Sequence, residues 1–124
     1  MKRFIVAVLL LLFSNAFAFA QSGKQVDADG VQFWSKFKAA VVANDKEAVA
    51  SITRLPFLFQ GRELTKQAFI QKFAVLFDAK AKRCFEKAKL VKEGEGFEVF
   101  CGQQIFLFDK VKGVYKFTEI GVND

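Results

Sequence analysis

The hydrophobic pattern of this chain changes period near Asp78, and this change limits the fold more than any other feature. Before Asp78 the apolar side chains recur every three to four residues, which is typical of amphipathic helices. After it they alternate with period two, which is typical of strands. This order predicts an α+β domain in which three N-terminal helices pack on a curved antiparallel sheet of four to five strands.

Capping and breaker residues place the three helices. The first is predicted over residues 30–44, where apolar side chains fall on one face. The second is predicted to begin with Asn44 as its N-cap and Glu47 as the capping-box partner, and to end before Pro56. Thr65 is the predicted N-cap of the third helix.

Glycine-rich breaks divide the predicted strands. A short strand and a turn at Gly61 follow the second helix. After the third helix, strands are predicted over residues 84–92, 97–103, 104–109 and 114–122. The break at Gly102 has an alternative, because residues 97–109 also fit one long strand with a glycine bulge.

The first twenty residues have the composition of a secretory signal peptide. Lys2 and Arg3 precede an apolar run, and Ala18-Phe19-Ala20 ends it as a small-x-small cleavage site. About ten strongly apolar residues are too few for a permanent membrane helix, which needs about 20. We therefore expect residues 21–124 to form a single domain that is exported to the periplasm or secreted, without stable membrane insertion.

Charge and the missing residue types narrow the functions that we expect. Residues 21–124 carry a net charge of +4, which favours acidic partners such as anionic lipid or glycan, and we expect no nucleic-acid partner. The chain contains no His, no GxGxxG, no P-loop and no CxxC. We therefore predict a protein without cofactor or metal, and more readily a binding domain than an enzyme.

Phenylalanine is in surplus, since 13 of the 17 Phe lie after residue 20. Phe lacks a polar group and suits cores and apolar cavities. The leading hypothesis is a domain that binds an apolar or amphipathic small molecule in a Phe-lined cavity. Its predicted wall residues are Phe33, Trp34, Phe37, Phe57, Phe59, Phe73, Phe106, Phe108, Tyr115 and Phe117. The alternative is an interaction module that forms a homodimer through the outer face of the sheet.

Three segments resemble the nuclear transport factor 2-like superfamily, which includes the SnoaL-like proteins. They are FWSKFKAAVVANDKEAVASI, the LPF that follows it, and the terminal KGVYKFTEIGV. The resemblance implies a curved sheet around a long first helix, with a conical cavity between them. A cystatin-like helix on a curved sheet is the competing architecture.

Cys84 and Cys101 are the two cysteines of the chain. In an exported chain of this size they predict one structural disulfide, with two buried free thiols as the alternative. A hairpin that turned at Lys92-Glu93 would place the two cysteines opposite each other. A turn at Gly94-Glu95, which the glycines favour, would displace them by four residues.

Glu119 and Tyr115 form the candidate catalytic pair. Strict alternation in VYKFTEIGV puts both on one strand face with Phe117. If that face lined a cavity, the carboxyl would have a raised pKa beside a phenol, as in lyases or isomerases that move a proton next to a carbonyl. The competing interpretation is a solvated glutamate on a half-exposed strand.

Six cations fall within thirteen residues: Lys80, Lys82, Arg83, Lys87, Lys89 and Lys92. Such a run could steer an anionic ligand or contact a membrane surface. The competing interpretation is a solvated strand edge, where lysine discourages pairing with another sheet.

Overall fold

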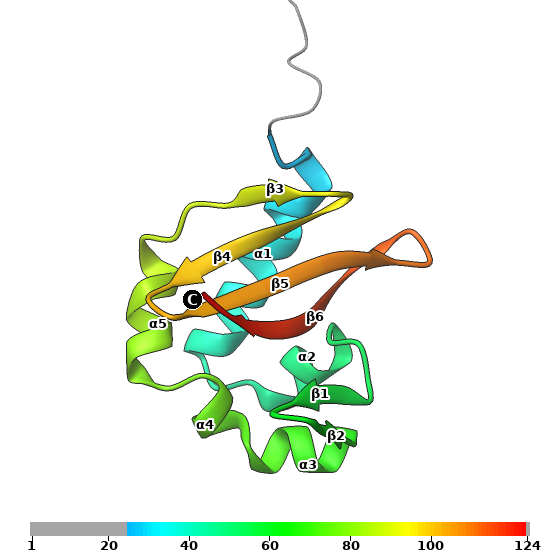
Figure 1. The fold of residues 1–124 in the computed structure, drawn as a ribbon, viewed down its shortest axis with the longest axis vertical. Helices are drawn as coiled ribbons and strands as arrows, with labels where there is room; N and C mark the ends of the chain where they lie inside the picture. The colour runs from blue at the N-terminus through cyan, green and yellow to red at the C-terminus, as the bar shows by residue number, and fades with distance from the viewer. Residues whose placement is uncertain (1–24, 124) are drawn as a thin grey trace, which may run out of the picture.

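The structure, a computed structural model, describes residues 25–123. The predicted signal peptide, residues 1–20, lies outside them. The elements are α1 (Ala28–Val42), α2 (Lys46–Ser51), β1 (Phe57–Phe59), β2 (Arg62–Leu64), α3 (Lys66–Gln71), α4 (Phe73–Leu76), α5 (Ala79–Glu86), β3 (Val91–Glu93), β4 (Gly96–Cys101), β5 (Gln104–Val111) and β6 (Val114–Val122) (Figure 1). The predicted α+β class is confirmed.

The main sheet has the strand order β3-β4-β5-β6, with every neighbouring pair antiparallel. Figure 1 shows α1 behind this sheet, α5 beside the end of β4, and the small β1–β2 sheet below β6. The glycine signals placed the turns correctly: β1 pairs with β2 around Gly61, and β4 pairs with β5 around Gly102. Residues 97–109 are therefore two strands rather than one long strand with a bulge.

The prediction of a strand over residues 84–92 is wrong for its first part, because Cys84–Glu86 belong to helix α5. Asp78 caps this helix, its carboxylate accepting a hydrogen bond from the backbone N–H of Ala81 at 2.8 Å. Ala81 and Phe85 lie four residues apart and are both buried, which is helical spacing. Only Val91–Glu93 of the predicted stretch form a strand, β3.

Two helix details also differ from the prediction. The N-cap of α2 is Asp45, whose carboxylate accepts from the backbone N–H of Ala48 at 3.1 Å. Asn44 instead adopts a left-handed backbone with φ of 54°, a conformation that asparagine tolerates better than most residues. The third helix begins after Thr65 as predicted, but it breaks at Lys72 into α3 and α4.

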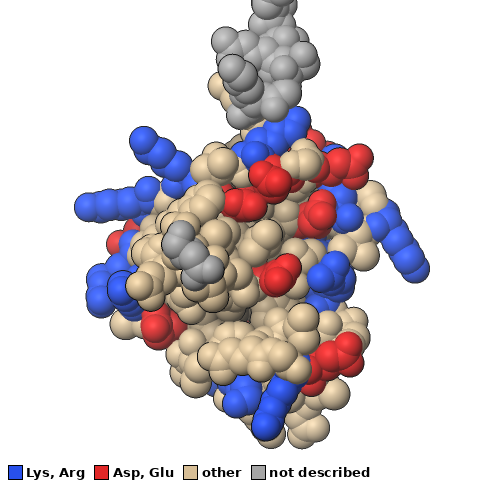
Figure 2. All heavy atoms as spheres, viewed as in Figure 1, with Lys and Arg blue, Asp and Glu red and all other residues tan. Residues whose placement is uncertain are grey.

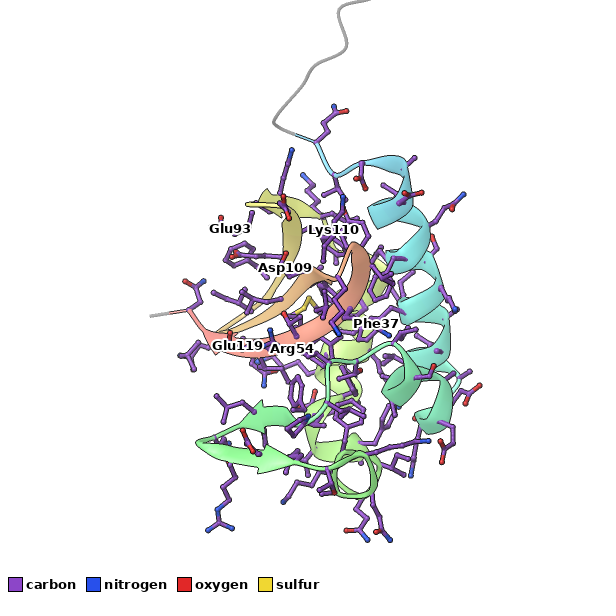
Figure 3. The ribbon with its side chains drawn as sticks, turned by 90° about the vertical axis from the view of Figure 1, so that its right-hand side faces the viewer. Phe37, Arg54, Glu93, Asp109, Lys110 and Glu119 are labelled. Atoms are coloured by element: carbon purple, nitrogen blue, oxygen red, sulfur yellow. A yellow bond between two sulfur atoms is a disulfide. The ribbon has the colours of Figure 1, made fainter. Side chains whose placement is uncertain are left out.

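The core lies between α1 and the inner face of the sheet, and phenylalanine dominates it. The Phe37 side chain on α1 is fully buried, and its ring contacts six other aromatic rings from helices and strands. Figure 3 shows Phe37 on the side of α1 that faces the sheet. Gly96 allows β4 to approach β5 closely, since a Cβ there would lie 1.9 Å from the carbonyl oxygen of Phe108. The sheet is held on α1 by aromatic packing, such as that of Phe37 on Phe108 and Phe117.

Asp27 ties the start of α1 to the β5–β6 hairpin. Its Oδ1 accepts hydrogen bonds from the backbone N–H of Gly30 and from the hydroxyl of Tyr115, both at 2.8 Å, and Lys110 Nζ lies 3.4 Å from Oδ2. The hydrogen bond from Gly30, then that from Tyr115, lowers the pKa of Asp27 below its ordinary value of 3.8. The ionised carboxylate therefore stabilises the folded chain above that pH, and its contribution is lost as the pH falls through the lowered pKa.

We expect Asp27→Ala to lower the free energy of unfolding by about 1–2 kcal/mol at neutral pH, because a cap and a partner of Tyr115 are lost together. Urea unfolding measured over a pH series should show the difference from the wild type shrinking below pH 3.8. Asp27→Asn is the control, because it keeps the acceptor oxygen and should cost less than the alanine variant. A loss that did not change with pH would contradict this role of the carboxylate.

Candidate functional site

The predicted wall residues are packed against one another. Of the ten, all but Phe33 and Phe59 are almost fully buried: Trp34, Phe37, Phe57, Phe73, Phe106, Phe108, Tyr115 and Phe117. Phe33 and Phe59 are half-buried and pack on the same cluster. The ring of Phe37 lies 4.9 Å from that of Phe108, and the ring of Phe57 lies 4.9 Å from that of Phe117. The structure thus brings these residues together as a hydrophobic core.

Glu119 and Tyr115 lie on opposite faces of β6, so the predicted shared face is wrong. The register with β5 shifts between Leu107 and Phe108: Phe108 pairs with Phe117, but Leu107 pairs with Glu119. This β-bulge turns Glu119 to the outer, exposed face, while Tyr115 stays inside. Burial, followed by the hydrogen bond to Asp27, raises the pKa of Tyr115 to about 12, so its phenol keeps the proton and acts as a structural donor.

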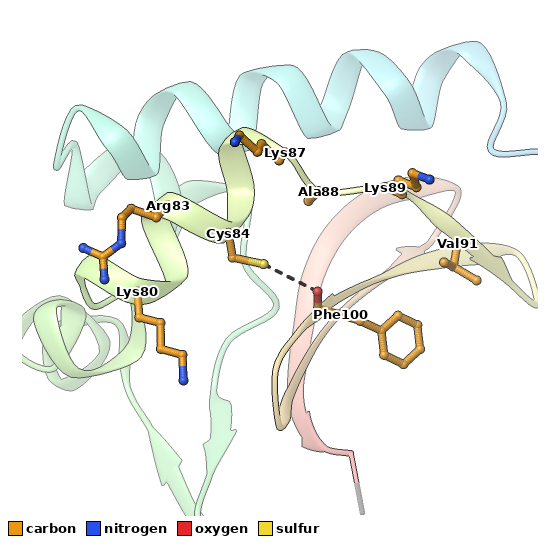
Figure 4. Close-up of a pocket in the computed structure, with 8 residues that line it drawn as sticks. All are labelled: Lys80, Arg83, Cys84, Lys87, Ala88, Lys89, Val91 and Phe100. Atoms are coloured by element: carbon orange, nitrogen blue, oxygen red, sulfur yellow. Dashed lines mark hydrogen bonds between the residues drawn. The ribbon is translucent and has the colours of Figure 1, made fainter.

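A surface groove lies between α5 and the edge of the main sheet. Its volume is about 620 Å³, and its lining residues are Lys80, Arg83, Cys84, Lys87, Ala88, Lys89, Val91 and Phe100 (Figure 4). None of the ten predicted wall residues lines it. Val91 and Phe100 are 44% and 42% exposed and give the groove apolar surface beside its cations. We call this feature the basic groove.

The predicted disulfide is confirmed and joins the two walls of the basic groove. Cys84 on α5 is bonded to Cys101 at the end of β4, with 5.8 Å between their Cα atoms. The disulfide does not join two paired strands, because Cys84 belongs to helix α5. The β3–β4 turn lies at Gly94-Glu95, as the glycines favoured, and places Val91 opposite Glu98. The Sγ atom of Cys84 lies 3.5 Å from the carbonyl oxygen of Phe100. This contact is not a hydrogen bond, because a sulfur atom in a disulfide carries no hydrogen. The disulfide is typical of an oxidising compartment.

The six-cation run is divided by the fold. Lys80, Arg83, Lys87 and Lys89 are exposed and line the basic groove. Lys82 instead donates to the side chain of Asn44, and Lys92 belongs to a separate depression. Within residues 25–123, the ion pairs are Lys66–Glu47 and Lys110–Asp27, so the four groove cations have no carboxylate partner. Their charge is therefore available to an anion.

The outer face of the main sheet is acidic, which the sequence analysis missed. Glu93, Glu98, Asp109 and Glu119 surround a depression of about 150 Å³, with Arg54 as the cation among them. Figure 3 shows Glu93, Asp109 and Glu119 on the side of the sheet away from α1. Burial, followed by the neighbouring charge of Glu93, raises the pKa of Glu98. The sequence did not show this acidic group because it depends on strand pairing, which places both Glu98 and Glu119 opposite Leu107.

Metal-binding clusters and membrane-spanning helices are absent from the described part of the chain. Residues 25–123 contain no group of three or more acidic or cysteine side chains arranged to hold a metal ion. No helix among these residues is both long and apolar enough to cross a membrane. The basic groove, with apolar residues and free cations side by side, remains the candidate functional site.

Comparison with family models, with curated proteins and with solved structures finds no match to this chain. The resemblance to the nuclear transport factor 2-like superfamily therefore stays a prediction.

Proposed function

We propose that this protein is an exported, non-enzymatic domain that binds an anionic amphiphile in the basic groove. The observation that carries the proposal is the set of four unpaired cations, Lys80, Arg83, Lys87 and Lys89, around two exposed apolar side chains, Val91 and Phe100. Export is supported by the disulfide and by the signal-peptide pattern of residues 1–20.

The two chemistries of the groove suit the two parts of one amphiphile. Lysine and arginine attract a phosphate, sulfate or carboxylate group, and arginine can bind such a group through two hydrogen bonds. Val91, Ala88 and Phe100 offer apolar surface to an alkyl chain. A neutral apolar molecule would leave the cations unused, whereas a small polar anion would leave the apolar surface in water.

The interior is a weaker place for the ligand. A ligand among the predicted wall residues would have to separate rings that now contact one another, such as Phe37 and Phe108. Separating them would lose contacts that stabilise the fold. The basic groove is already open and needs no such change.

Decyl phosphate, kept below its micelle concentration, is the test ligand, and decyl glucoside is its neutral counterpart. We expect calorimetric titration to detect binding of decyl phosphate and much weaker binding of the glucoside. The combined variant Lys80→Glu, Arg83→Glu and Lys87→Glu should weaken decyl phosphate binding by about 30-fold, since each exposed cation contributes about 0.7 kcal/mol.

The matched control reverses three exposed cations outside the groove: Arg62→Glu, Lys72→Glu and Lys112→Glu. It changes the net charge equally, so it should leave binding within about threefold if the groove is the site. The same loss of affinity in both variants would show that net charge alone attracts the ligand. That result, or no binding of decyl phosphate by the wild type, would overturn the proposal.

A further inference from the structure

We infer that the basic groove docks on the surface of an anionic phospholipid bilayer, so that its amphiphile is a lipid that stays in the membrane. This inference rests on the proposed function and names the source of the ligand. The occupant follows from the shape of the groove, the position of Phe100 and the distribution of charge.

The shape of the groove suits a ligand of which only the headgroup and the adjoining part of the alkyl chain contact the protein. Sites that carry a free amphiphile bury most of its surface. Here the apolar surface is short: Ala88, Val91, Phe100 and the disulfide, on a depression that is open to solvent. A free alkyl chain lying there would keep one side in water. A lipid in a bilayer keeps the rest of its chains among other chains, so only its headgroup and the chain segment next to it contact the groove.

The exposed ring of Phe100 lines the same groove as the four cations. Figure 4 shows Phe100 and Val91 at one side of the groove, with Lys80 and Arg83 projecting from the facing helix α5. Proteins that bind membrane surfaces combine these features: basic side chains contact lipid phosphates, and apolar side chains enter the headgroup boundary. Exposure of Phe100 to water is unfavourable in the free protein, and contact with a bilayer would remove it.

The charge distribution distinguishes the α5 wall of the groove from the outer face of the sheet. Figure 2 shows basic side chains projecting at the left, where α5 lies, and also at the right, top and bottom of the view, while acidic side chains gather over the sheet face in front. The acidic residues there are Glu93, Glu98, Asp109 and Glu119. Val91 and Phe100 border this acidic face, because Val91 pairs with Glu98 and Phe100 lies two residues further along β4. The α5 wall of the groove, with Lys80, Arg83 and Lys87, is therefore the part complementary to an anionic bilayer.

Cosedimentation with vesicles tests the inference. The protein is recovered from an exporting bacterial host, and mass spectrometry establishes its N-terminus, because uncleaved residues 1–20 would themselves bind lipid. We expect binding to vesicles of phosphatidylcholine mixed with phosphatidylglycerol, and little binding to phosphatidylcholine alone. Raising the salt from about 0.1 M to about 1 M should release the protein, since the screening length falls from about 10 Å to about 3 Å.

Two variants locate the contact. Arg83→Ala should weaken partitioning about fivefold, the contribution of one cation near such a surface. Phe100→Ala should also weaken it about fivefold, because its half-exposed ring would no longer be buried. Leu58→Ala removes a 51% exposed side chain outside the groove and is the matched control, with no change expected.

The outcomes separate the two proposals. Binding of decyl phosphate without binding of anionic vesicles would overturn the membrane inference and leave the proposed function standing. If the protein bound neither decyl phosphate nor anionic vesicles, both the proposed function and the membrane inference would be overturned. Vesicle binding that Arg83→Ala and Phe100→Ala leave unchanged would overturn the inference too, because the contact would then lie elsewhere.

Discussion

Phe37→Ala is expected to lower the free energy of unfolding by about 3–5 kcal/mol, the largest effect of any single substitution considered. The Phe37 side chain is fully buried and contacts rings from α1, α5, β5, β6 and the segment after α4. Removing it leaves a cavity where helices and sheet meet. Urea unfolding followed by circular dichroism measures the loss, which is a large share of the stability of a small domain.

Phe100→Ala is the matched control for this prediction, because it removes the same ring from a position that is 42% exposed. We expect it to cost less than about 1 kcal/mol. If both variants lost similar stability, or if Phe37→Ala lost less than about 1 kcal/mol, Phe37 would not be at the centre of a tightly packed core. The ring cluster would then contain unfilled space, as the Phe-lined ligand cavity predicted from the sequence requires.

Replacing both Cys84 and Cys101 by alanine is expected to lower the free energy of unfolding by about 3 kcal/mol. The bond closes a loop with a sequence separation of 17, and loops of about that length give this value in the chain-entropy model. The variant should still fold, because Phe85 on α5 remains fully buried among Trp34, Phe37, Phe77 and Phe106.

Reduction of the wild-type protein by dithiothreitol is the independent check on the cysteine variant. Both should lose the same stability in urea unfolding, since each opens the same loop. Wild-type protein whose stability did not change on reduction would contradict a stabilising disulfide. A double variant as stable as the oxidised wild type would do the same.

The fold class and most turns could be predicted because they depend on local signals. Thr65 caps its helix, and Gly61 and Gly102 sit in turns, as the sequence indicated. Part of helix α5 was mistaken for a strand because Ala88 and Leu90 alternate with Lys87 and Lys89, a period-two pattern that does not extend back to Cys84. The deciding facts were the cap at Asp78 and the burial of Phe85, and the second of these depends on tertiary packing.

The candidate site was harder to predict because it depends on the relative position of distant segments. The cation run was visible in the sequence, but Phe100 joins it only because α5 packs beside the end of β4. Alternation also failed at Glu119, since one bulge between β5 and β6 reverses the face of every later residue. The surplus of Phe was informative about the core and did not identify the place of a ligand.

Mapping of decyl phosphate binding by NMR tests the central claim most directly. The backbone amide signals of the purified, isotope-labelled protein are followed during a titration with the ligand. We expect the largest shifts at Arg83, Ala88, Val91 and Phe100, with the amides of the buried Phe37 and Phe117 almost unchanged. Shifts centred on the aromatic core, or on the acidic outer face around Glu98 and Glu119, would contradict a ligand site in the basic groove.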